Sequence, residues 1–561
     1  MSNEMKTCSE PMYKMIVEKD VMVPARDGVK LAVDVFRPDA PGKFPGLFAI
    51  SPYGKDTQTF STPEQDFGGS VFEAAIEAGD MEFFVSRGYC YVVGDFRGTG
   101  SSEGELPGML SKYEGEDGHD IIEWMAQQPW CNGDIGGIGT CYYGFVQLMI
   151  AETQPPHLKC IAPFELNFDD FYERGFYTGG VLHLIWYCMV GGSHPCRIGV
   201  APKNVVSAMA QELTPEELRE RVEEACKNPD LEQYPYIYQV LRYPYRNPVV
   251  FDLLLNPLDG PYYQERSYGN YLDKVTIPTW VGGPFHGPFG VCQTAVYNKL
   301  TNTPYKKLWL WEMMDPRPWK SKTYDLLRWY DYWLKGIDTG IMDEPQCIVE
   351  SHGKARAVEG WPPKNLEYEN FYLCQKGKML SKPGMFNHEP DSFLQRPLFV
   401  SEERGMLVYK SAPLSKELKV AGSPILKFYA SLDQKDTTWR VELFEGGHET
   451  PWPITKGYLR ASLRKRVPEK DTPYQIAHDY TKFDYPIEGE IYEYELQLRP
   501  TAHTFRAGSQ VEIQISAIDI PLDETSYDEM WHMCPCQTTL HKIYRDETHF
   551  SVLRIPYEPE E

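Results

Sequence analysis

The stretch DIGGIGTCYYGFVQL, residues 134–148, decides the fold class of this chain. It begins as a short apolar strand, turns sharply after Gly139 and continues with helical spacing from Tyr143. This order of strand, tight turn and helix is typical of a nucleophile elbow, which holds a reactive side chain at a strained turn. Gly139 and Gly144 let the strand and the helix approach each other, and Cys141 occupies the nucleophile position.

The helix that follows the turn would direct its N-terminus at Cys141. Free N–H groups and the helix dipole at that end favour a thiolate and a developing oxyanion. The other interpretation is an inert cysteine buried in a strand-to-helix turn, which is common in proteins. A second stretch, GSSEG at residues 100–104, fits the G-x-S-x-G pattern by its letters. A loop and not a helix follows it, so Ser102 is not expected to be catalytic.

Strands and helices alternate around the elbow, which predicts a parallel sheet with helices on both faces and an α/β fold class. Strands are expected at 44–51, 89–94, 134–139, 275–283 and 306–311. Helices are expected at 81–87, 116–128, 143–152, 291–302 and 329–335. Residues 21–39 are expected to form a hairpin that turns at an Asp-Gly pair.

Two segments break this alternation. Residues 164–256 are rich in aromatic residues and helical signals, including a capping box at 214–217, and predict a helical insertion. From about residue 347, short alternating strands and turns predict an all-β sandwich or jelly roll. The expected domains are a first α/β part (1–160), a helical cap (161–260), a second α/β part (261–346) and a β-sandwich (347–561).

Composition narrows the class of protein. The net charge of −24 argues against nucleic acid and anionic membrane as partners, since both need basic patches. No apolar run reaches 18 residues and the first residues contain no apolar signal region, so a cytoplasmic protein is expected. The 13 cysteines are scattered apart from a CPC at 534–536, which predicts free thiols in a reducing compartment. No metal or cofactor is expected, and a homo-oligomer is left open.

Four motifs carry a resemblance to a known family: SPYGK (51–55), DFRGTGSSEG (95–104), WCNGDIG (130–136) and WYDYWLKGIDTG (329–340). They are similar to segments of the cocaine esterase and X-prolyl dipeptidyl-peptidase hydrolases, which include glutaryl acylases and α-amino-acid ester hydrolases. The resemblance runs from about residue 17 to 555. It implies an α/β-hydrolase domain with a helical cap and a C-terminal β jelly-roll domain.

The chain departs from the family at all three catalytic positions. The family elbow is G-x-S-Y-x-G, and here GTCYYG (139–144) places Cys141 at the serine. The family acid ends G-G-W-Y-D, and here GGPFH ends in His286. The family base ends G-P-W-x-H, and here WEMMD ends in Asp315. Because the three residue types are still cysteine, histidine and aspartate, the resemblance predicts a rebuilt catalytic triad.

The resemblance also implies an oxyanion hole made by the Tyr53 hydroxyl and the backbone N–H of Tyr142. Aromatic residues of the cap are expected either to line an acyl pocket or to be ordinary core. Those assigned to the pocket are Phe168, Tyr172, Phe176 and Trp186. Asp95 and Arg97 are expected to pair and hold a loop, and Glu165 is too isolated in the sequence for an interpretation.

Three functions are compatible with these residues. The first is a hydrolase or acyltransferase that uses Cys141 as nucleophile on an ester, thioester or amide of a small organic acyl compound, aromatic acyl compounds included. The second is a non-covalent acid–base enzyme, such as a lyase, cyclase or C–C cleaving enzyme. The third is a binding protein without activity. A small-molecule substrate is expected in each case.

Overall fold

The structure of the protein is a computed structural model. It describes residues 8–59, 76–183, 204–228, 238–285, 290–311, 321–351, 353–384, 387–397, 400–401, 403–447, 453–518 and 537–559. Three predicted site residues, Trp186, His286 and Asp315, lie outside these ranges. The cysteines at 534 and 536 lie outside them as well.

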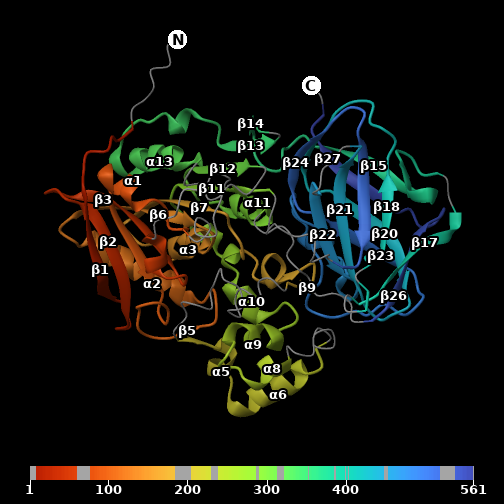
Figure 1. The fold of residues 1–561 in the computed structure, drawn as a ribbon, viewed down its shortest axis with the longest axis horizontal. Coiled ribbons are helices and arrows are strands. Elements are labelled where there is room, and N and C mark those ends of the chain that lie inside the picture. Colours follow the sequence, from red (N-terminus) through yellow and green to blue (C-terminus); the bar gives the residue numbers. More distant parts are fainter. Residues whose placement is uncertain are drawn as a thin grey trace, which may run out of the picture.

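A ten-stranded sheet forms the core of the α/β part, in the order β1-β2-β4-β3-β6-β7-β11-β12-β13-β14 (Figure 1). Neighbours from β4 to β13 run parallel, whereas β1–β2, β2–β4 and β13–β14 are antiparallel. The strands are β1 (Met15–Pro24), β2 (Lys30–Pro38), β3 (Phe44–Ser51), β4 (Cys90–Asp95), β6 (Cys131–Thr140), β7 (Leu158–Phe164), β11 (Thr279–Pro284), β12 (Lys306–Trp311), β13 (Cys347–Ser351) and β14 (Lys354–Val358). The predicted hairpin and the predicted parallel strands are confirmed.

Helices cover both faces of this sheet, which explains why its central strands are apolar almost throughout. A Cβ on Gly136 of β6 would lie 3.0 Å from the ring of Tyr330 on one side. A Cβ on Gly137 would lie 3.0 Å from Gln147 on the other side. The helices of this part are α1 (Met81–Ser86), α2 (Lys112–Ala126), α3 (Cys141–Glu152), α11 (Gly290–Lys299) and α13 (Thr323–Lys335).

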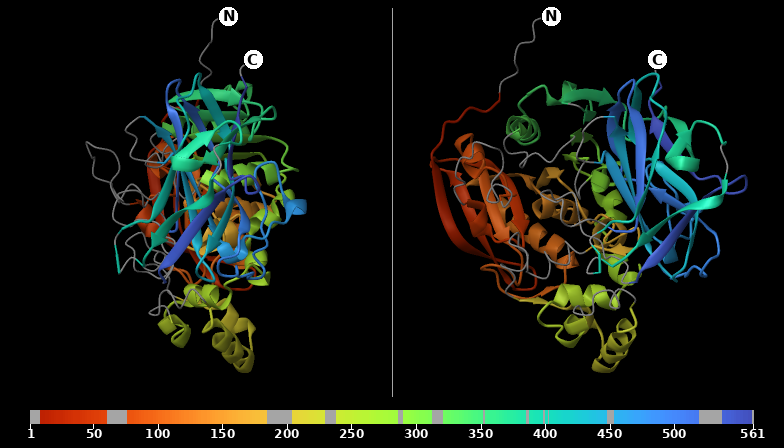
Figure 2. Two further views of the ribbon diagram at one scale, coloured as in Figure 1. Left: turned by 90° about the vertical axis from the view of Figure 1, so that its right-hand side faces the viewer. Right: turned by 45° about the vertical axis from the view of Figure 1, so that its right-hand side comes forward.

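The predicted helical insertion is a group of short helices that projects below the sheet in Figures 1 and 2. Thr214 and Glu217 form the predicted capping box at the start of α6. The helices are α5 (Ala208–Glu212), α6 (Pro215–Ala225), α8 (Tyr238–Arg242), α9 (Pro248–Leu255) and α10 (Pro261–Arg266). The start of the insertion instead holds a π-helical turn, η3 (Tyr172–Phe176), and the small hairpin of β8 (Tyr177–Thr178) and β9 (Val181–Leu182). The two-residue strands β5 (Leu106–Pro107) and β10 (Val205–Val206) pair with each other.

The C-terminal part is a β-rich domain with its own apolar core, and its described residues form thirteen strands (Figure 1). Its strands are β15 (Glu367–Cys374), β16 (Lys378–Leu380), β17 (Asn387–Gln395), β18 (Met406–Lys410), β19 (Leu418–Gly422), β20 (Ile425–Leu432), β21 (Thr438–Gly446), β22 (Thr455–Arg460), β23 (Tyr492–Gln497), β24 (Thr501–Phe505), β25 (Gln510–Ser516), β26 (Thr539–Arg545) and β27 (Val552–Tyr557). β13 and β14 extend the α/β sheet, although the sequence places residues 347–358 in the sandwich. The four expected domain ranges remain predictions.

Short 3₁₀ turns complete the described elements: η1 (Lys55–Thr59), η5 (Tyr268–Asn270), η6 (Leu272–Lys274), η7 (Ile341–Asp343), η8 (Gln375–Gly377), η9 (Ala461–Leu463) and η10 (Pro468–Lys470). The β-rich domain is joined to the start of the insertion by part-buried polar contacts. Tyr480 donates a hydrogen bond to Glu173 at 2.9 Å, and Gln475 donates to the same carboxyl at 2.6 Å. Among the described residues, no helix is long and apolar enough to cross a membrane.

Candidate active site

Cys141 lies at the junction of β6 and α3, as the first residue of the helix. Its φ of 53° is in the left-handed region, which non-glycine residues rarely adopt. The side chain is 5% exposed. A strained, non-glycine residue between a strand and a helix is the geometry expected of a nucleophile elbow.

Two glycines make this turn possible, as predicted. A Cβ on Gly139 would lie 2.3 Å from the Cβ of Tyr143, and the φ of Gly139 is 144°. A Cβ on Gly144 would lie 2.3 Å from the carbonyl oxygen of Phe164 on the neighbouring strand. Neither position accepts a side chain, because backbone or a packed Cβ blocks it. The strand, the helix and β7 therefore meet at van der Waals distance around Cys141.

Tyr53 follows β3, the strand next to β6, and its hydroxyl lies 3.7 Å from the Cys141 sulfur. Its ring packs edge-on against Tyr142, with centroids 5.6 Å apart. Burial raises the pKa of Tyr53 well above its ordinary value, and Cys141 and the Glu77 carboxyl add to this. Tyr53 is therefore a neutral hydroxyl donor at neutral pH.

A buried ion network fixes the turn that carries Tyr53. The Lys55 side chain is fully buried, and its ammonium lies 2.9 Å from Asp34 and 2.7 Å from Asp20. The Lys55 backbone N–H donates to Asp95 at 2.7 Å. Because both the side chain and the backbone of Lys55 are held, the hydroxyl of Tyr53 has a fixed position beside the sulfur.

Tyr142 contributes only its backbone to the site. Its side chain points into the core, where its hydroxyl donates a hydrogen bond to the carboxyl of Glu114. Burial raises the pKa of Glu114 to about 8. The Tyr142 N–H belongs to the first turn of α3, where backbone donors have no partner within the helix.

The other two predicted catalytic residues, His286 and Asp315, follow strands of the same sheet at its carboxyl edge. β7 lies between β6 and β11, and β12 follows β11. His286 comes two residues after the end of β11, and Asp315 comes four residues after the end of β12. Both strands therefore lead toward the edge at which Cys141 lies. His286 and Asp315 themselves lie outside the described residues, so their roles stay predictions.

Two sequence models match this chain. The X-Pro dipeptidyl-peptidase (S15 family) model matches residues 27–313, and the X-Pro dipeptidyl-peptidase C-terminal non-catalytic domain model matches residues 339–553. The chain belongs to the S15 family. It is thus an α/β-hydrolase of the esterase and peptidase class, which acts on ester or amide bonds of a small-molecule or peptide substrate.

The similarity to the relatives named below extends over nearly the whole length of this chain. The chain is 23% identical to cocaine esterase from Rhodococcus sp., over 96% of this chain and 98% of that protein. The crystal structure of a CocE/NonD family hydrolase from Staphylococcus aureus is similar, with a TM-score of 0.75 and 20% identity over 97% and 94% of the two chains. An aminopeptidase from a marine sediment archaeon, Thaumarchaeota archaeon, has a TM-score of 0.72 and 17% identity over 99% and 98%. These likenesses establish the α/β-hydrolase fold with a β-rich C-terminal domain.

The aromatic residues predicted for the S15 pocket are deeply buried. Phe168 and Phe176 stack at 5.7 Å, and Phe168 also contacts Phe145 of α3 at 5.6 Å. Tyr172 donates its hydroxyl to the carbonyl of Pro257 at 3.1 Å. They form part of one apolar core with the sheet. Their role in lining a pocket stays a prediction, and Trp186 lies outside the described residues.

Ser102, the rival nucleophile of the GSSEG stretch, is fully engaged in holding its own turn. Its hydroxyl donates to the carbonyl of Asp95 at 2.7 Å and accepts from the N–H of Ala32 at 2.8 Å. The predicted pairing of Asp95 with Arg97 is wrong. Arg97 instead pairs with Asp117 of α2, with N–O distances from 2.5 to 3.1 Å, because its side chain reaches across to that helix.

Sequence reasoning gave no role to Glu77 and Glu165, two buried acids whose backbones lie close to the elbow in the fold. The carbonyl of Glu77 accepts the N–H of Thr140 at 3.0 Å. Glu165 follows directly after β7, is 0% exposed and has a φ of 54°. The signal available in the sequence was position: an acidic residue directly after a buried parallel strand lies at the edge where ligands bind.

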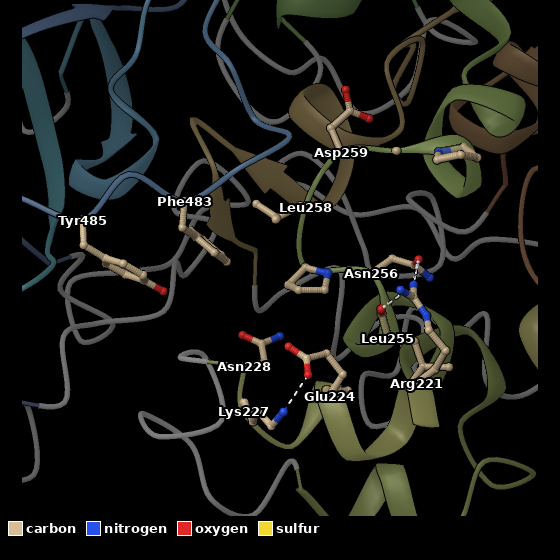
Figure 3. Close-up of a pocket in the computed structure, with 14 residues that line it drawn as sticks. Arg221, Glu224, Lys227, Asn228, Leu255, Asn256, Leu258, Asp259, Phe483 and Tyr485 are labelled. Carbon is tan, nitrogen blue, oxygen red and sulfur yellow. Dashed lines mark hydrogen bonds and ion pairs between the residues drawn. The ribbon is translucent and has the colours of Figure 1, made fainter. Parts of the chain in front are cut away.

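A separate cavity of about 460 Å³ lies between the helical insertion and the β-rich domain (Figure 3). Arg221 of α6 borders it and donates to Leu255 at 3.0 Å and to Asn256 at 2.8 Å. Phe483 and Tyr485 form the wall contributed by the β-rich domain. None of the predicted site residues within the described ranges lines this cavity, and Cys141 lies elsewhere.

The described part of the chain offers no group of three histidine, cysteine or acidic side chains that could hold a metal. Its nine cysteines are free thiols, of which Cys226 is exposed and Cys8 is half-buried. Reactivity at Cys141 would therefore come from its position at the elbow and not from general exposure.

Proposed function

We propose that this S15-family enzyme is a cysteine hydrolase or acyltransferase that acts on an ester, thioester or amide of a small organic acyl compound. The supporting observation is the strained position of Cys141 at the start of α3, with the Tyr53 hydroxyl 3.7 Å from its sulfur. The family as a whole is one of serine hydrolases. The proposal assigns to cysteine the place that serine has in the family motif.

In the acylation step, the Cys141 sulfur attacks the carbonyl carbon and forms a tetrahedral intermediate. His286 takes the thiol proton and gives it to the leaving group when the intermediate collapses, and Asp315 orients the imidazole. The product is a thioester between Cys141 and the acyl group. His286 and Asp315 enter this scheme from the family motifs.

The negative charge of the intermediate falls on the former carbonyl oxygen. The Tyr53 hydroxyl and the Tyr142 N–H would donate to it, and each such donor is worth about 3 kcal/mol. A neutral hydroxyl is the right donor, and burial keeps Tyr53 neutral by raising its pKa. The ion network around Lys55 holds this donor in place without reorganisation.

One observation favours the second function, a non-covalent acid–base enzyme. Glu165 directly follows the strand next to β6, and a carboxylate near a thiol disfavours the thiolate. In that mechanism the acidic groups would move protons on the substrate, and Cys141 would only shape the site.

Acyl transfer to Cys141 separates the two functions. We would incubate the enzyme with p-nitrophenyl acetate and measure intact mass and peptide masses. The proposal predicts one acetyl group on the peptide that holds Cys141, and none in Cys141→Ala. Cys226→Ser is the matched control, since it removes an exposed thiol and leaves the elbow unchanged. Undiminished turnover in Cys141→Ala without an adduct would instead support the non-covalent mechanism.

A further inference from the structure

The residue that follows β7 lies beside the residue that follows β6. The two strands run parallel, and their last paired residues are Thr140 and Phe164. Cys141 and Glu165 are the next residue on each strand. Since paired strands lie about 4.8 Å apart, these two residues leave the sheet as direct neighbours.

Both residues adopt the same unusual backbone conformation. The φ of Cys141 is 53° and that of Glu165 is 54°, and neither residue is glycine. Such conformations persist only where the surrounding structure enforces them, and they concentrate at functional sites. Glu165 is also 0% exposed, and full burial is rare for a glutamate side chain.

The surroundings fix the position of Glu165 relative to the elbow. Its N–H donates to the carbonyl of Gly282 on β11 at 2.7 Å. The side chain of Gln147, on α3, donates to the carbonyl of Tyr143 at 2.9 Å and accepts from the N–H of Ala162 on β7 at 3.1 Å. These bonds tie β7, β11 and α3 together immediately behind the two residues.

A different residue therefore follows the strand on each side of β6. Tyr53 follows β3 on one side of β6, and Glu165 follows β7 on the other. The hydroxyl of Tyr53 suits the oxyanion, because it is a neutral donor. A carboxylate cannot stabilise an oxyanion, but it can accept a proton from an attacking nucleophile.

We infer that Glu165 is a catalytic general base for the second half of the reaction, an inference that rests on the proposed acylation of Cys141. Water or another acceptor attacks the thioester carbon and gives its proton to the Glu165 carboxylate. The new C–O bond forms, the C–S bond breaks, and the departing Cys141 sulfur takes the proton from Glu165. Thiol and carboxylate are both restored.

Electrostatics favour this division of labour. In the free enzyme, a Glu165 carboxylate next to Cys141 would oppose formation of the thiolate. Once the sulfur is acylated it carries no charge, so the penalty disappears and the carboxylate can serve as a base. A positioned general base contributes about 10²- to 10⁴-fold in rate.

The test is Glu165→Gln assayed with p-nitrophenyl acetate, in which the burst of p-nitrophenol reports acylation and the steady state reports deacylation. We expect a burst of the wild-type size and a steady-state rate lower by about 10²-fold. Acetyl-enzyme should accumulate by intact mass. Hydroxylamine, a strong nucleophile that needs no base, should restore turnover, and the steady-state rate should lose its dependence on pH.

The matched control is Glu152→Gln, which changes a glutamate at the far end of α3, about 16 Å from Cys141. It should leave the burst and the steady state unchanged. Equal losses of burst and steady state in Glu165→Gln, without rescue by hydroxylamine, would show a structural role and overturn the inference. An unchanged steady state would overturn it as well.

Failure of the proposed function has a different signature. If the wild-type enzyme forms no acetyl adduct on Cys141, the covalent mechanism fails regardless of Glu165. If the adduct forms normally and Glu165→Gln turns over at the wild-type rate, only the role of Glu165 fails. Glu165→Asp keeps a carboxylate and should retain part of the steady-state rate, which guards against a misfolded glutamine variant.

Discussion

The elbow at 139–144 and the GSSEG turn at 100–104 have similar sequences but different structures. Both are rich in glycine and place a potential nucleophile after a buried strand. At the elbow, a helix starts at Cys141 and a hydroxyl lies 3.7 Å from the sulfur. In the GSSEG turn, the Ser102 hydroxyl is used up by two backbone groups.

The difference shows that a match to a sequence motif is not sufficient to identify a nucleophile. A reactive side chain needs a conformation that exposes it to a substrate and backbone donors that stabilise charge. Ser102 has neither, because its hydroxyl both donates and accepts within its own turn. Cys141 has strained backbone and a helix N-terminus, although its side chain is largely covered.

The largest expected effect is the loss of Cys141. Cys141→Ala should lower kcat by about 10³-fold or more, because the covalent step disappears. Steady-state kinetics with an activated ester measure it, with thermal unfolding as the check on folding. A variant that keeps most of its activity would remove the distinction between the two turns.

The next effect concerns the residues that lie outside the described ranges. His286→Ala should reduce kcat by nearly as much as Cys141→Ala, because no group then moves the thiol proton. Asp315→Asn should leave a measurable rate, because it only orients the imidazole. If Asp315→Asn is the more damaging change, the Cys-His-Asp triad is wrong and the acid–base mechanism replaces it.

Removal of the Tyr53 hydroxyl should have an intermediate effect. Tyr53→Phe is expected to lower kcat by about 10²-fold, because one donor to the oxyanion is lost. The free energy of unfolding should change by only about 1 kcal/mol. Kinetics and urea unfolding of the same preparation separate the two effects. A rate equal to that of the wild type would exclude Tyr53 from the oxyanion hole.

Glu114, which holds the ring of Tyr142 beneath the elbow, should make stability depend on pH. Burial raises its pKa from the ordinary 4.5 to about 8, so the folded state binds a proton that the unfolded state has lost. Its contribution to stability is present below about pH 4.5 and is lost as pH rises to about 8, by at most about 1.4 kcal/mol per pH unit. Glu114→Gln should flatten this slope in unfolding experiments, whereas Glu116→Gln on the same helix should not.

The smallest effect on activity is expected at the GSSEG turn. Ser102→Ala should keep kcat within about twofold and should lower the free energy of unfolding by about 1–3 kcal/mol, because the N–H of Ala32 loses its buried acceptor. The same ester assay and urea unfolding measure both quantities. A collapse of activity in a folded Ser102→Ala protein would mean that the wrong turn was chosen as the elbow.

Local sequence determined much of the fold. The apolar runs, the glycines around residue 140 and the capping box at 214–217 each appear in the structure as the element that they predict. These signals depend on neighbours within a few residues, so a single sequence carries them. The same patterns predicted the helical insertion and the β-rich part, and the family motifs added the assignment to the α/β-hydrolase architecture.

Contacts between distant segments could not be read in the same way. Arg97 pairs with Asp117 and not with Asp95, because the choice depends on how α2 packs against the loop. β13 and β14 join the α/β sheet, because a strand edge was available to them beside β12. Alternating strands look the same in the sequence whichever sheet they extend.

By itself, the sequence determined that Cys141 stands at a strand-to-helix turn of an α/β-hydrolase, since the turn is built from adjacent residues. Only the tertiary structure decided what surrounds it. Tyr53 and Glu165 follow the two strands that flank β6, and sheet order puts one residue on each side of it. Chemistry at this edge depends on which strands pair, and that pairing is fixed by packing across the whole domain and not by any one stretch of residues.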